Sequence, residues 1–164
     1  MRLVLALFAL SLAAGCGSVT PTGTPPAASC EATLPNGDTP PGEEPGPTYY
    51  GNGRLYTSLW PNGEILADPR FIEADGSIGM KFAWWRAPGV GAAGDLQITG
   101  HELRTGATIT ASIPDGYGQR FQASGIFYPT EGCYEITATS GDAQLTFVTK
   151  VTKVAAPAAG RLPR

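Results

Sequence analysis

The residues able to do nucleophilic or metal chemistry are few: one histidine, His101, and three cysteines, Cys16, Cys30 and Cys133. A Ser-His-Asp triad needs a nucleophilic serine beside the histidine, and the chain contains no Gly-x-Ser-x-Gly motif. A zinc site needs several His or Cys ligands together. No EF-hand loop, phosphate loop or dinucleotide fingerprint occurs either. We therefore interpret His101 as a solvated turn residue and predict no catalytic site, no metal site and no cofactor.

The acidic residues do not change this prediction. Glu43 and Glu44 lie in a proline-rich stretch, where no pocket can raise a carboxyl pKa for acid–base catalysis. Glu73 and Asp75 flank a turn signal and are expected to be solvated. A small envelope hydrolase, or an inhibitor of one, is the alternative, and it would need a deep cleft that joins His101 to carboxylates.

Composition excludes two further classes of protein. Only 15% of the 164 residues are charged and the net charge is −3, so the chain lacks the cationic surplus of a nucleic-acid binder. The 22 glycines and 15 prolines exclude a coiled coil or a helical bundle. A hydrophobic content of 42% suffices for one core.

The N-terminus has the three parts of a signal peptide. A basic Met1-Arg2 start precedes an apolar run over residues 3–12, which is too short to span a bilayer, and small residues follow. The segment Leu12-Ala13-Ala14-Gly15-Cys16 resembles the lipobox of bacterial lipoproteins. The resemblance implies a signal peptide over 1–15 and a lipid-modified (palmitate-bearing) Cys16. The mature protein would then be exported and anchored on the extracytoplasmic face of the bacterial membrane. An ordinary secretory cleavage is the alternative.

Lipidation of Cys16 would leave two cysteines, Cys30 and Cys133, in an oxidising compartment. We expect them to form a disulfide that closes a loop of about 100 residues. Two free buried thiols are the alternative.

Residues 16–48 differ in composition from the rest of the mature chain and predict a Pro/Gly-rich tether. They include Pro21, Pro25, Pro26, Pro35, Pro40, Pro41, Pro45 and Pro47. Such a segment buries too little apolar surface to order itself, so the tether is predicted to be disordered. Its stretch before Cys30 could reach roughly 40 Å from the bilayer. Beyond Cys30 the disulfide would hold residues 31–48 along the domain surface. The Ala/Pro-rich tail, 155–164, is also predicted to be disordered.

Residues 49–154 predict an all-β domain. Short β-branched and aromatic runs alternate with glycine turns, among them Pro61-Asn62-Gly63 and Asp75-Gly76, which are hairpin signals. The runs predict strands at 54–60, 64–67, 71–74, 78–86, 95–100, 107–113, 120–128, 133–140 and 143–153.

Alternating polarity assigns the two faces of each strand. Met80, Phe82 and Trp84 share one face of strand 78–86, while Lys81, Ala83 and Trp85 share the other. Strands that each have one apolar face must pack face to face. We therefore predict an antiparallel β-sandwich of about seven to nine strands.

Two segments carry a resemblance to immunoglobulin-like domains. Lys81-Phe82-Ala83-Trp84-Trp85-Arg86 is similar to their central tryptophan-bearing strand. Gly132-Cys133-Tyr134-Glu135-Ile136-Thr137, followed by Leu145-Thr146-Phe147-Val148, is similar to their last hairpin. The layout as a whole resembles small bacterial lipoproteins with one such domain. Cys133 departs from the antibody pattern, because its parity places the sulfur outward, towards the segment that bears Cys30.

Trp85 is the leading candidate for binding a ligand, since it must point away from the core if Trp84 points into it. Trp60, Tyr56, Tyr49, Tyr50 and Tyr117 are further candidates. The competing interpretation is that the proline-rich segment covers Trp85. We expect a monomeric, lipid-anchored, non-enzymatic binding module of the cell envelope, with a protein or a glycan as ligand and no nucleic-acid partner. A purely structural spacer is a further alternative.

Overall fold

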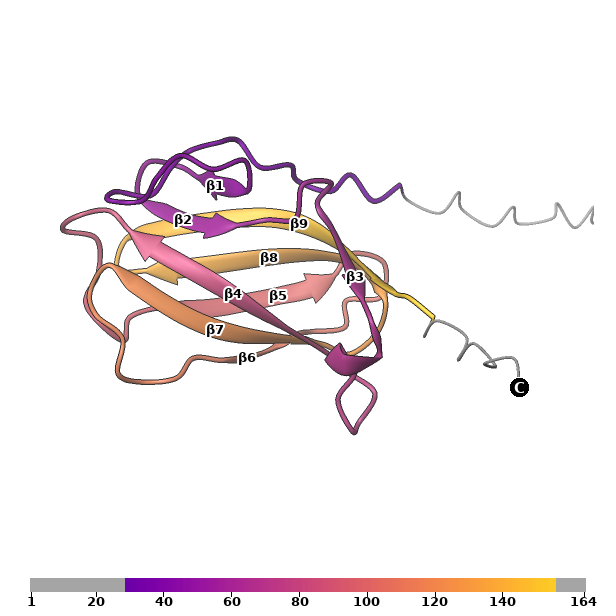
Figure 1. Ribbon diagram of the computed structural model, residues 1–164. Coiled ribbons are helices and arrows are strands. Elements are labelled where there is room, and N and C mark those ends of the chain that lie inside the picture. The colour runs from indigo at the N-terminus through magenta and orange to yellow at the C-terminus, as the bar shows by residue number, and fades with distance from the viewer. Residues whose placement is uncertain (1–28, 156–164) are drawn as a thin grey trace, which may run out of the picture.

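The computed structural model describes residues 29–155 as two packed β-sheets (Figure 1). The predicted signal peptide, the proposed lipidation site Cys16, the start of the tether and the tail 156–164 lie outside the described residues. Within 29–155 there is no α-helix, and hence none long and apolar enough to cross a membrane. The predicted all-β class is thus confirmed.

The first sheet has five antiparallel strands in the order β1-β2-β4-β7-β6. Their bounds are β1 Tyr49–Gly51, β2 Leu55–Ser58, β4 Ile78–Arg86, β7 Phe121–Tyr128 and β6 Thr110–Ser112. The long central strands β4 and β7 pair along almost their whole length, from Ile78 opposite Tyr128 to Trp85 opposite Phe121. This sheet is the nearer layer in Figure 1.

The second sheet has four strands in the order β3-β9-β8-β5. Their bounds are β3 Glu64–Ala67, β9 Ala143–Lys153, β8 Gly132–Ser140 and β5 Gln97–Glu102. The described chain has nine strands, within the predicted range, although β1 was not among the predicted strands. The prediction of an entirely antiparallel sandwich is wrong, however, because β3 pairs in parallel with β9, Glu64 lying opposite Lys150.

The turn at Pro61-Asn62-Gly63 forms as predicted, with the Gly63 amide donating to the Trp60 carbonyl at 2.8 Å. It does not make a hairpin, because the strands on either side of it, β2 and β3, belong to different sheets. A turn motif specifies a local reversal of the chain, whereas the partner of each strand is chosen by packing at long range.

Two further strand predictions need correction. Residues 71–74 are not a strand: a 3₁₀ turn, η1 (Pro69–Phe71), forms there because Pro69 fits its first position and the Asp68 carboxylate caps the Arg70 amide at 2.8 Å. Ile72 alone forms a β-bridge, with Ile78. The predicted strand at 107–113 shortens to β6, preceded by a single bridge between His101 and Thr108.

The core lies between the sheets and confirms the predicted alternation. Along β4, Met80, Phe82 and Trp84 are buried, and Lys81 is exposed. The Trp84 ring stacks on Phe82 and packs against Phe147 of the opposite sheet, and its Nε1 donates to Ser124 Oγ at 2.9 Å. The indole donor is therefore satisfied within the core, as buried tryptophan requires.

The predicted disulfide is confirmed: Cys30 and Cys133 are bonded, with their Cα atoms 5.6 Å apart. Residues 30–48, which we call the strap, lie on the domain surface, as expected of 31–48. The prediction of a disordered tether over 16–48 is wrong for the strap, because hydrogen bonds to the domain order it. The Thr33 amide donates a hydrogen bond to the Val148 carbonyl at 2.8 Å, and Thr33 Oγ1 accepts one from the Val148 amide at 2.9 Å. The folded unit therefore begins at Cys30.

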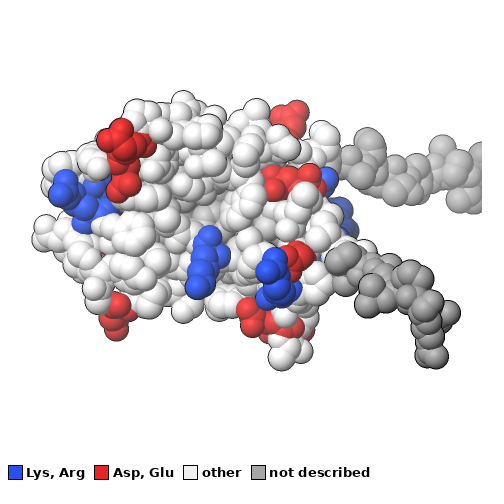
Figure 2. Space-filling model, in the orientation of Figure 1, with Lys and Arg blue, Asp and Glu red and all other residues white. Residues whose placement is uncertain are grey.

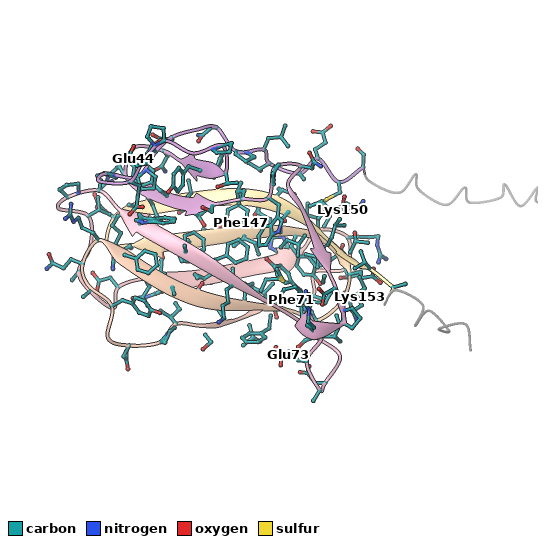
Figure 3. All side chains as sticks on the ribbon, in the orientation of Figure 1. Glu44, Phe71, Glu73, Phe147, Lys150 and Lys153 are labelled. Carbon is teal, nitrogen blue, oxygen red and sulfur yellow. A yellow bond between two sulfur atoms is a disulfide. The ribbon has the colours of Figure 1, made fainter. Side chains whose placement is uncertain are left out.

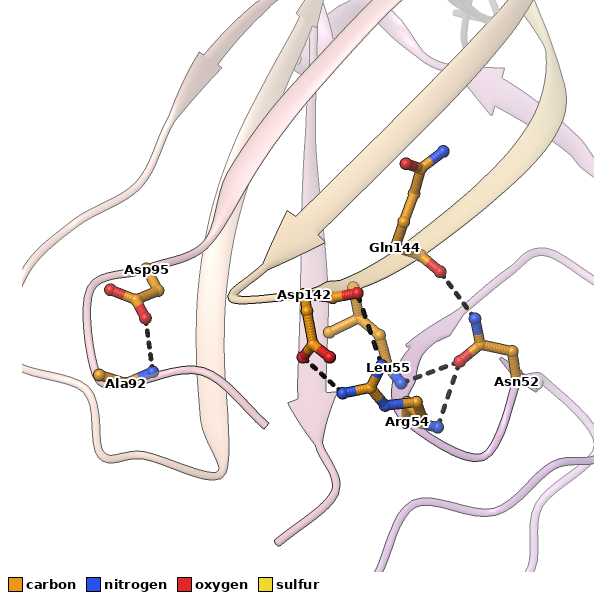
Figure 4. Close-up of polar contacts among 7 residues, drawn as sticks. All are labelled: Asn52, Arg54, Leu55, Ala92, Asp95, Asp142 and Gln144. Atoms are coloured by element: carbon orange, nitrogen blue, oxygen red, sulfur yellow. Dashed lines mark hydrogen bonds and ion pairs between the residues drawn. The ribbon is translucent and has the colours of Figure 1, made fainter. Parts of the chain in front are cut away.

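Side chains from the turn between β1 and β2 protect the rest of the same edge of β9 (Figure 4). Asn52 Nδ2 donates to the Gln144 carbonyl at 2.7 Å, and Arg54 forms an ion pair with Asp142. Tyr50 Oη donates to the Thr146 carbonyl at 3.1 Å. These contacts satisfy edge carbonyls that would otherwise offer a pairing site to another chain.

Strand β8 runs the length of the domain, so its first and last residues mark the two ends of the domain. Cys133 lies at its beginning and Ser140 at its end, so these residues are about 23 Å apart at the usual rise per residue. In Figure 1 the chain leaves the described region at both termini on the Cys133 side. The loops at 87–95 and 114–120 lie at the Ser140 end.

Candidate binding surface

Trp85 faces the outer side of the five-stranded sheet, opposite to Trp84. Around it lies an aromatic cluster, which consists of Tyr49, Trp85, Phe121 and Tyr117. Successive ring centroids are 5.5 Å apart from Tyr49 to Trp85, 5.5 Å from Trp85 to Phe121 and 5.6 Å from Phe121 to Tyr117. All three contacts are edge-to-face, the favourable geometry for aromatic pairs.

Strand register brings the members of the cluster together. Trp85 on β4 lies directly opposite Phe121 on β7, and side chains in opposite positions point to the same face of a sheet. Tyr117 comes from the loop before β7, and Tyr49 from the short strand β1. The sequence singled out Trp85, Tyr117 and Tyr49 as candidates but not Phe121, whose place beside Trp85 depends on this register.

The strap covers one side of the cluster. Trp85 Nε1 donates a hydrogen bond to Glu43 Oε1 at 3.1 Å, and the indole is half-buried. Phe121 and Tyr117, on the other side, are each 36% exposed. Both interpretations of Trp85 are therefore partly realised: the strap shields Trp85, while the Phe121–Tyr117 side of the cluster is open to solvent.

Two of the predicted binding residues lie elsewhere. Tyr56 is on the same outer face but is only 5% exposed, because its ring packs over Gly51, where any Cβ would collide with it. Burial and the nearby Asp38 raise the pKa of its phenol. Trp60 is half-buried and packs edge-on against the core residue Phe82 at 5.5 Å. Neither side chain contributes to the open part of the cluster.

A shallow groove of about 680 Å³ continues from Tyr117 along the outer face to Phe71, beside η1. Small residues, among them Ala123 and Gly125, form part of its walls. A Cβ at Gly79 would lie 2.5 Å from Glu73 Oε1 and 3.1 Å from the Phe127 ring, so a larger residue there would displace the Glu73 side chain. Figure 3 shows Phe71 and Glu73 together at the η1 end, away from Glu44 in the strap.

Charges are sparse on this face, and most of the surface visible in Figure 2 belongs to uncharged residues. Lys81 lines the groove, is exposed and forms no ion pair within residues 29–155. Arg70, also at the groove, is held by Asp68 through a hydrogen-bonded ion pair that raises the pKa of the guanidinium. A long, open and mostly apolar groove of this kind can accommodate an extended ligand.

His101 is exposed, but the prediction that it is a turn residue is wrong, because it lies on β5 opposite Glu135. It lines none of the four prominent grooves of residues 29–155. Residues 29–155 also contain no group of three His, Cys, Asp or Glu side chains that could hold a metal ion. The structure thus places His101 beside one acidic residue, Glu135, on an open face of the sheet and not in the deep cleft that the hydrolase alternative would need.

A second groove, of about 810 Å³, lies at the Ser140 end of the domain between the loops 87–95 and 114–120. Next to it the Arg86 side chain is 2% exposed. Its Nη1 donates to the Ala92 carbonyl at 2.5 Å and its Nη2 to the Gly118 carbonyl at 3.1 Å. Sequence reasoning did not select Arg86, although a signal was present: Arg86 has the inward parity of Met80, Phe82 and Trp84.

Burial lowers the pKa of the Arg86 guanidinium, and the neighbouring Asp95 partly offsets this effect. No carboxylate among the residues that the structure describes forms an ion pair with Arg86. Its Nε has no hydrogen-bond partner within the same residues. The loop end of the domain thus contains a buried cation whose direct hydrogen-bond partners are all neutral oxygen atoms.

The chain was compared with known proteins. No protein-family model matches it. A search of curated proteins finds no match either.

Proposed function

We propose that this protein is a lipid-anchored, non-enzymatic binding module of the bacterial cell envelope. Its binding surface is the aromatic cluster together with the adjoining groove. The observation that carries the proposal is the open side of the cluster, where Phe121 and Tyr117 are each 36% exposed beside a groove of about 680 Å³. Exposed neighbouring aromatic side chains are typical anchors of binding surfaces.

The position of the cluster within the domain supports this function. The strap joins the domain at Cys133, at the start of β8. Trp85 precedes Arg86, whose guanidinium lies 3.5 Å from Ser140 at the other end of that strand. An anchor at Cys16 would therefore attach to one end of the domain and leave the aromatic cluster at the far end, directed away from the bilayer.

We further propose that the sandwich is of the immunoglobulin-like type. A buried tryptophan on a central strand, Trp84 on β4, packs between the two sheets against Phe147. The disulfide differs from that of antibody domains, because it joins the strap to the outside of β8 rather than sheet to sheet.

A structural spacer would need no open aromatic surface, so the exposure of Tyr117 and Phe121 argues against that alternative. The hydrolase alternative gains no support from the exposed position of His101. The ligand class that fits the groove is an extended envelope glycan or protein segment, since either can lie along an open apolar channel.

The binding surface can be tested by site-specific photo-crosslinking in intact cells. A photoreactive phenylalanine analogue would replace Tyr117 in one version of the full chain. In a matched control it would replace Leu34, which is 59% exposed on the strap. We expect a discrete higher-mass adduct from position 117 only. No adduct at 117, or the same adducts from both positions, would contradict the proposed surface.

The anchor is tested separately. Cys16→Ser should move the protein from the membrane fraction to the soluble exported fraction and abolish incorporation of labelled palmitate. Cys133→Ser, which leaves Cys16 intact, is the control and should remain membrane-bound. Persistence of the Cys16→Ser protein in membranes would refute lipid anchoring while leaving the binding surface untouched.

A further inference from the structure

Arg86 is an unusual residue for a core position. It is among the largest fully buried side chains of the domain, and the cost of burying a guanidinium is normally offset by a carboxylate partner. Here the partners are carbonyl oxygens of Ala92 and Gly118, and Ser140 Oγ at 3.5 Å. The charge therefore has no carboxylate in direct contact within residues 29–155, although Asp95 lies nearby, and it is located where the two loops meet.

The loops next to Arg86 contain backbone amides that have no hydrogen-bond partner within residues 29–155. Gly89 and Gly91 adopt positive φ angles of 80° and 59°, which turn their peptide groups in ways that other residues rarely allow. The amides of Gly89, Gly91 and Gly118 donate no hydrogen bond within residues 29–155. Added Cβ atoms at Gly89 and Gly118 would meet nothing within 4 Å, so these two glycines face open space.

The one carboxylate in the first loop is already engaged. Asp95 Oδ2 accepts the Ala92 amide at 2.7 Å and closes the 92–95 turn (Figure 4). This contact shapes the loop that presents the Ala92 carbonyl to Arg86. Asp95 therefore helps to build the groove but does not neutralise the guanidinium with a direct ion pair.

We propose that the groove between loops 87–95 and 114–120 is a binding site for a small oxyanion, a carboxylate or a phosphate group. The amides of Gly89, Gly91 and Gly118 donate hydrogen bonds to the oxyanion, and the buried charge of Arg86 attracts it from below. Backbone amides on glycine-rich turns, combined with a nearby fixed cation, are an effective anion receptor. This site is independent of the lipid anchor and of the function proposed for the aromatic cluster.

Phe121 connects the two surfaces, because it lines this groove and belongs to the aromatic cluster. A ligand that carries an anionic group next to an apolar or ring-shaped part would contact both. The peptide carboxyl terminus, an acidic sugar and a phosphorylated polymer share this chemistry, and the probes below separate carboxylate from phosphate.

The test is a titration of the ¹⁵N-labelled full chain, with its disulfide formed, followed by backbone amide chemical shifts. Sodium acetate and sodium phosphate are added in separate series, with sodium chloride as a third series at equal ionic strength. We expect saturable shifts of the Gly89, Gly91 and Gly118 amides with at least one oxyanion. Saturation by acetate alone identifies a carboxylate site, and saturation by phosphate alone identifies a phosphate site. Linear shifts with both oxyanions, indistinguishable from those in chloride, would overturn the proposal.

A matched pair of variants then tests the donors. Gly118→Pro removes one amide donor, whereas Gly118→Ala retains it and adds a methyl group to open space. The apparent Kd for the saturating oxyanion should rise about tenfold in Gly118→Pro and change little in Gly118→Ala. Arg104→Gln removes an exposed cation at the Cys133 end of the domain, away from both proposed surfaces, and should leave the Kd unchanged. Equal weakening by Gly118→Ala or by Arg104→Gln would also refute the site.

Discussion

The indole Nε1 of Trp85 donates a hydrogen bond to Glu43 Oε1 at 3.1 Å, and the two residues are separated by 42 positions in the chain. Through this bond the strap lies against the aromatic cluster. The next residue, Glu44, is exposed and forms no side-chain hydrogen bond within residues 29–155 (Figure 3). The pair therefore offers a matched comparison.

Glu43→Ala should release the strap from Trp85. We expect stronger acrylamide quenching of the Trp85 fluorescence, measured in a Trp60→Phe background so that only the core residue Trp84 remains beside it. Because the bond is partly solvated, the free energy of unfolding should fall by only about 0.5–1 kcal/mol. Glu44→Ala is the control. Equal quenching in the two variants would mean that the hydrogen bond does not hold the strap.

Removal of the disulfide should lower stability strongly. Cys30 and Cys133 are 103 positions apart. A disulfide that closes a loop of this length lowers the entropy of the unfolded chain and thereby stabilises the fold by about 4–5 kcal/mol. The double variant Cys30→Ser/Cys133→Ser should lose a comparable free energy of unfolding in urea denaturation. Wild-type protein in reducing agent should approach the same value. An unchanged unfolding curve would show that the disulfide does not contribute to the stability of the domain.

Replacement of Arg86 by lysine should destabilise the domain although the charge is kept. A lysine ammonium cannot reproduce the fork that reaches Ala92 on one side and Gly118 on the other. We expect a loss of about 2–4 kcal/mol in urea denaturation, because hydrogen bonds to charged groups are among the stronger ones. Arg104→Lys, at an exposed position, is the control and should be neutral. A neutral Arg86→Lys would show that only the charge matters.

Glu102 should contribute to the acid sensitivity of the fold. Hydrogen bonds from the Thr105 hydroxyl and amide, each at 2.6 Å, and from the Arg104 amide lower the pKa of this buried carboxyl. A carboxyl pKa that is lower in the folded state stabilises the protein above the unfolded value of about 4.3. This stabilisation is lost as the pH falls through the folded pKa.

Glu102→Gln should therefore lower the free energy of unfolding by about 1–2 kcal/mol at pH 7 and by much less near pH 3. Urea denaturation at the two pH values measures the difference. Glu44→Gln, with an exposed side chain, should show no such change. The same loss at both pH values would assign the effect to packing rather than to charge.

Much of the fold could be predicted because each strand carries its own pattern. The run 78–86 was predicted with the bounds that β4 has, and its alternation placed Trp84 inside and Trp85 outside. By contrast, 71–74 was predicted as a strand from its residue types alone. Pro69 and the Asp68 cap formed a 3₁₀ turn there instead, since a local hydrogen bond competed with sheet pairing.

The candidate site was only partly predictable for the same reason. Trp85 and Tyr117 stand out by residue type, whereas Phe121 joins them only through the register of β4 and β7. Tyr56 and Trp60 have equally suitable side chains, but Gly51 and Phe82 give them packing partners that exclude them from the open surface. Which of several aromatic residues stays exposed depends on what covers each one.

The sequence by itself determined the all-β class, the two faces of the long strands and the pairing of Cys30 with Cys133, because these depend on local periodicity and on a small set of thiols. Only the tertiary structure decided the parallel pairing of β3 with β9, the placement of the strap against Trp85 and the burial of Arg86 between two loops. Those features arise from contacts between residues far apart in the chain. Their choice depends on the packing of both sheets at once, which no local pattern encodes.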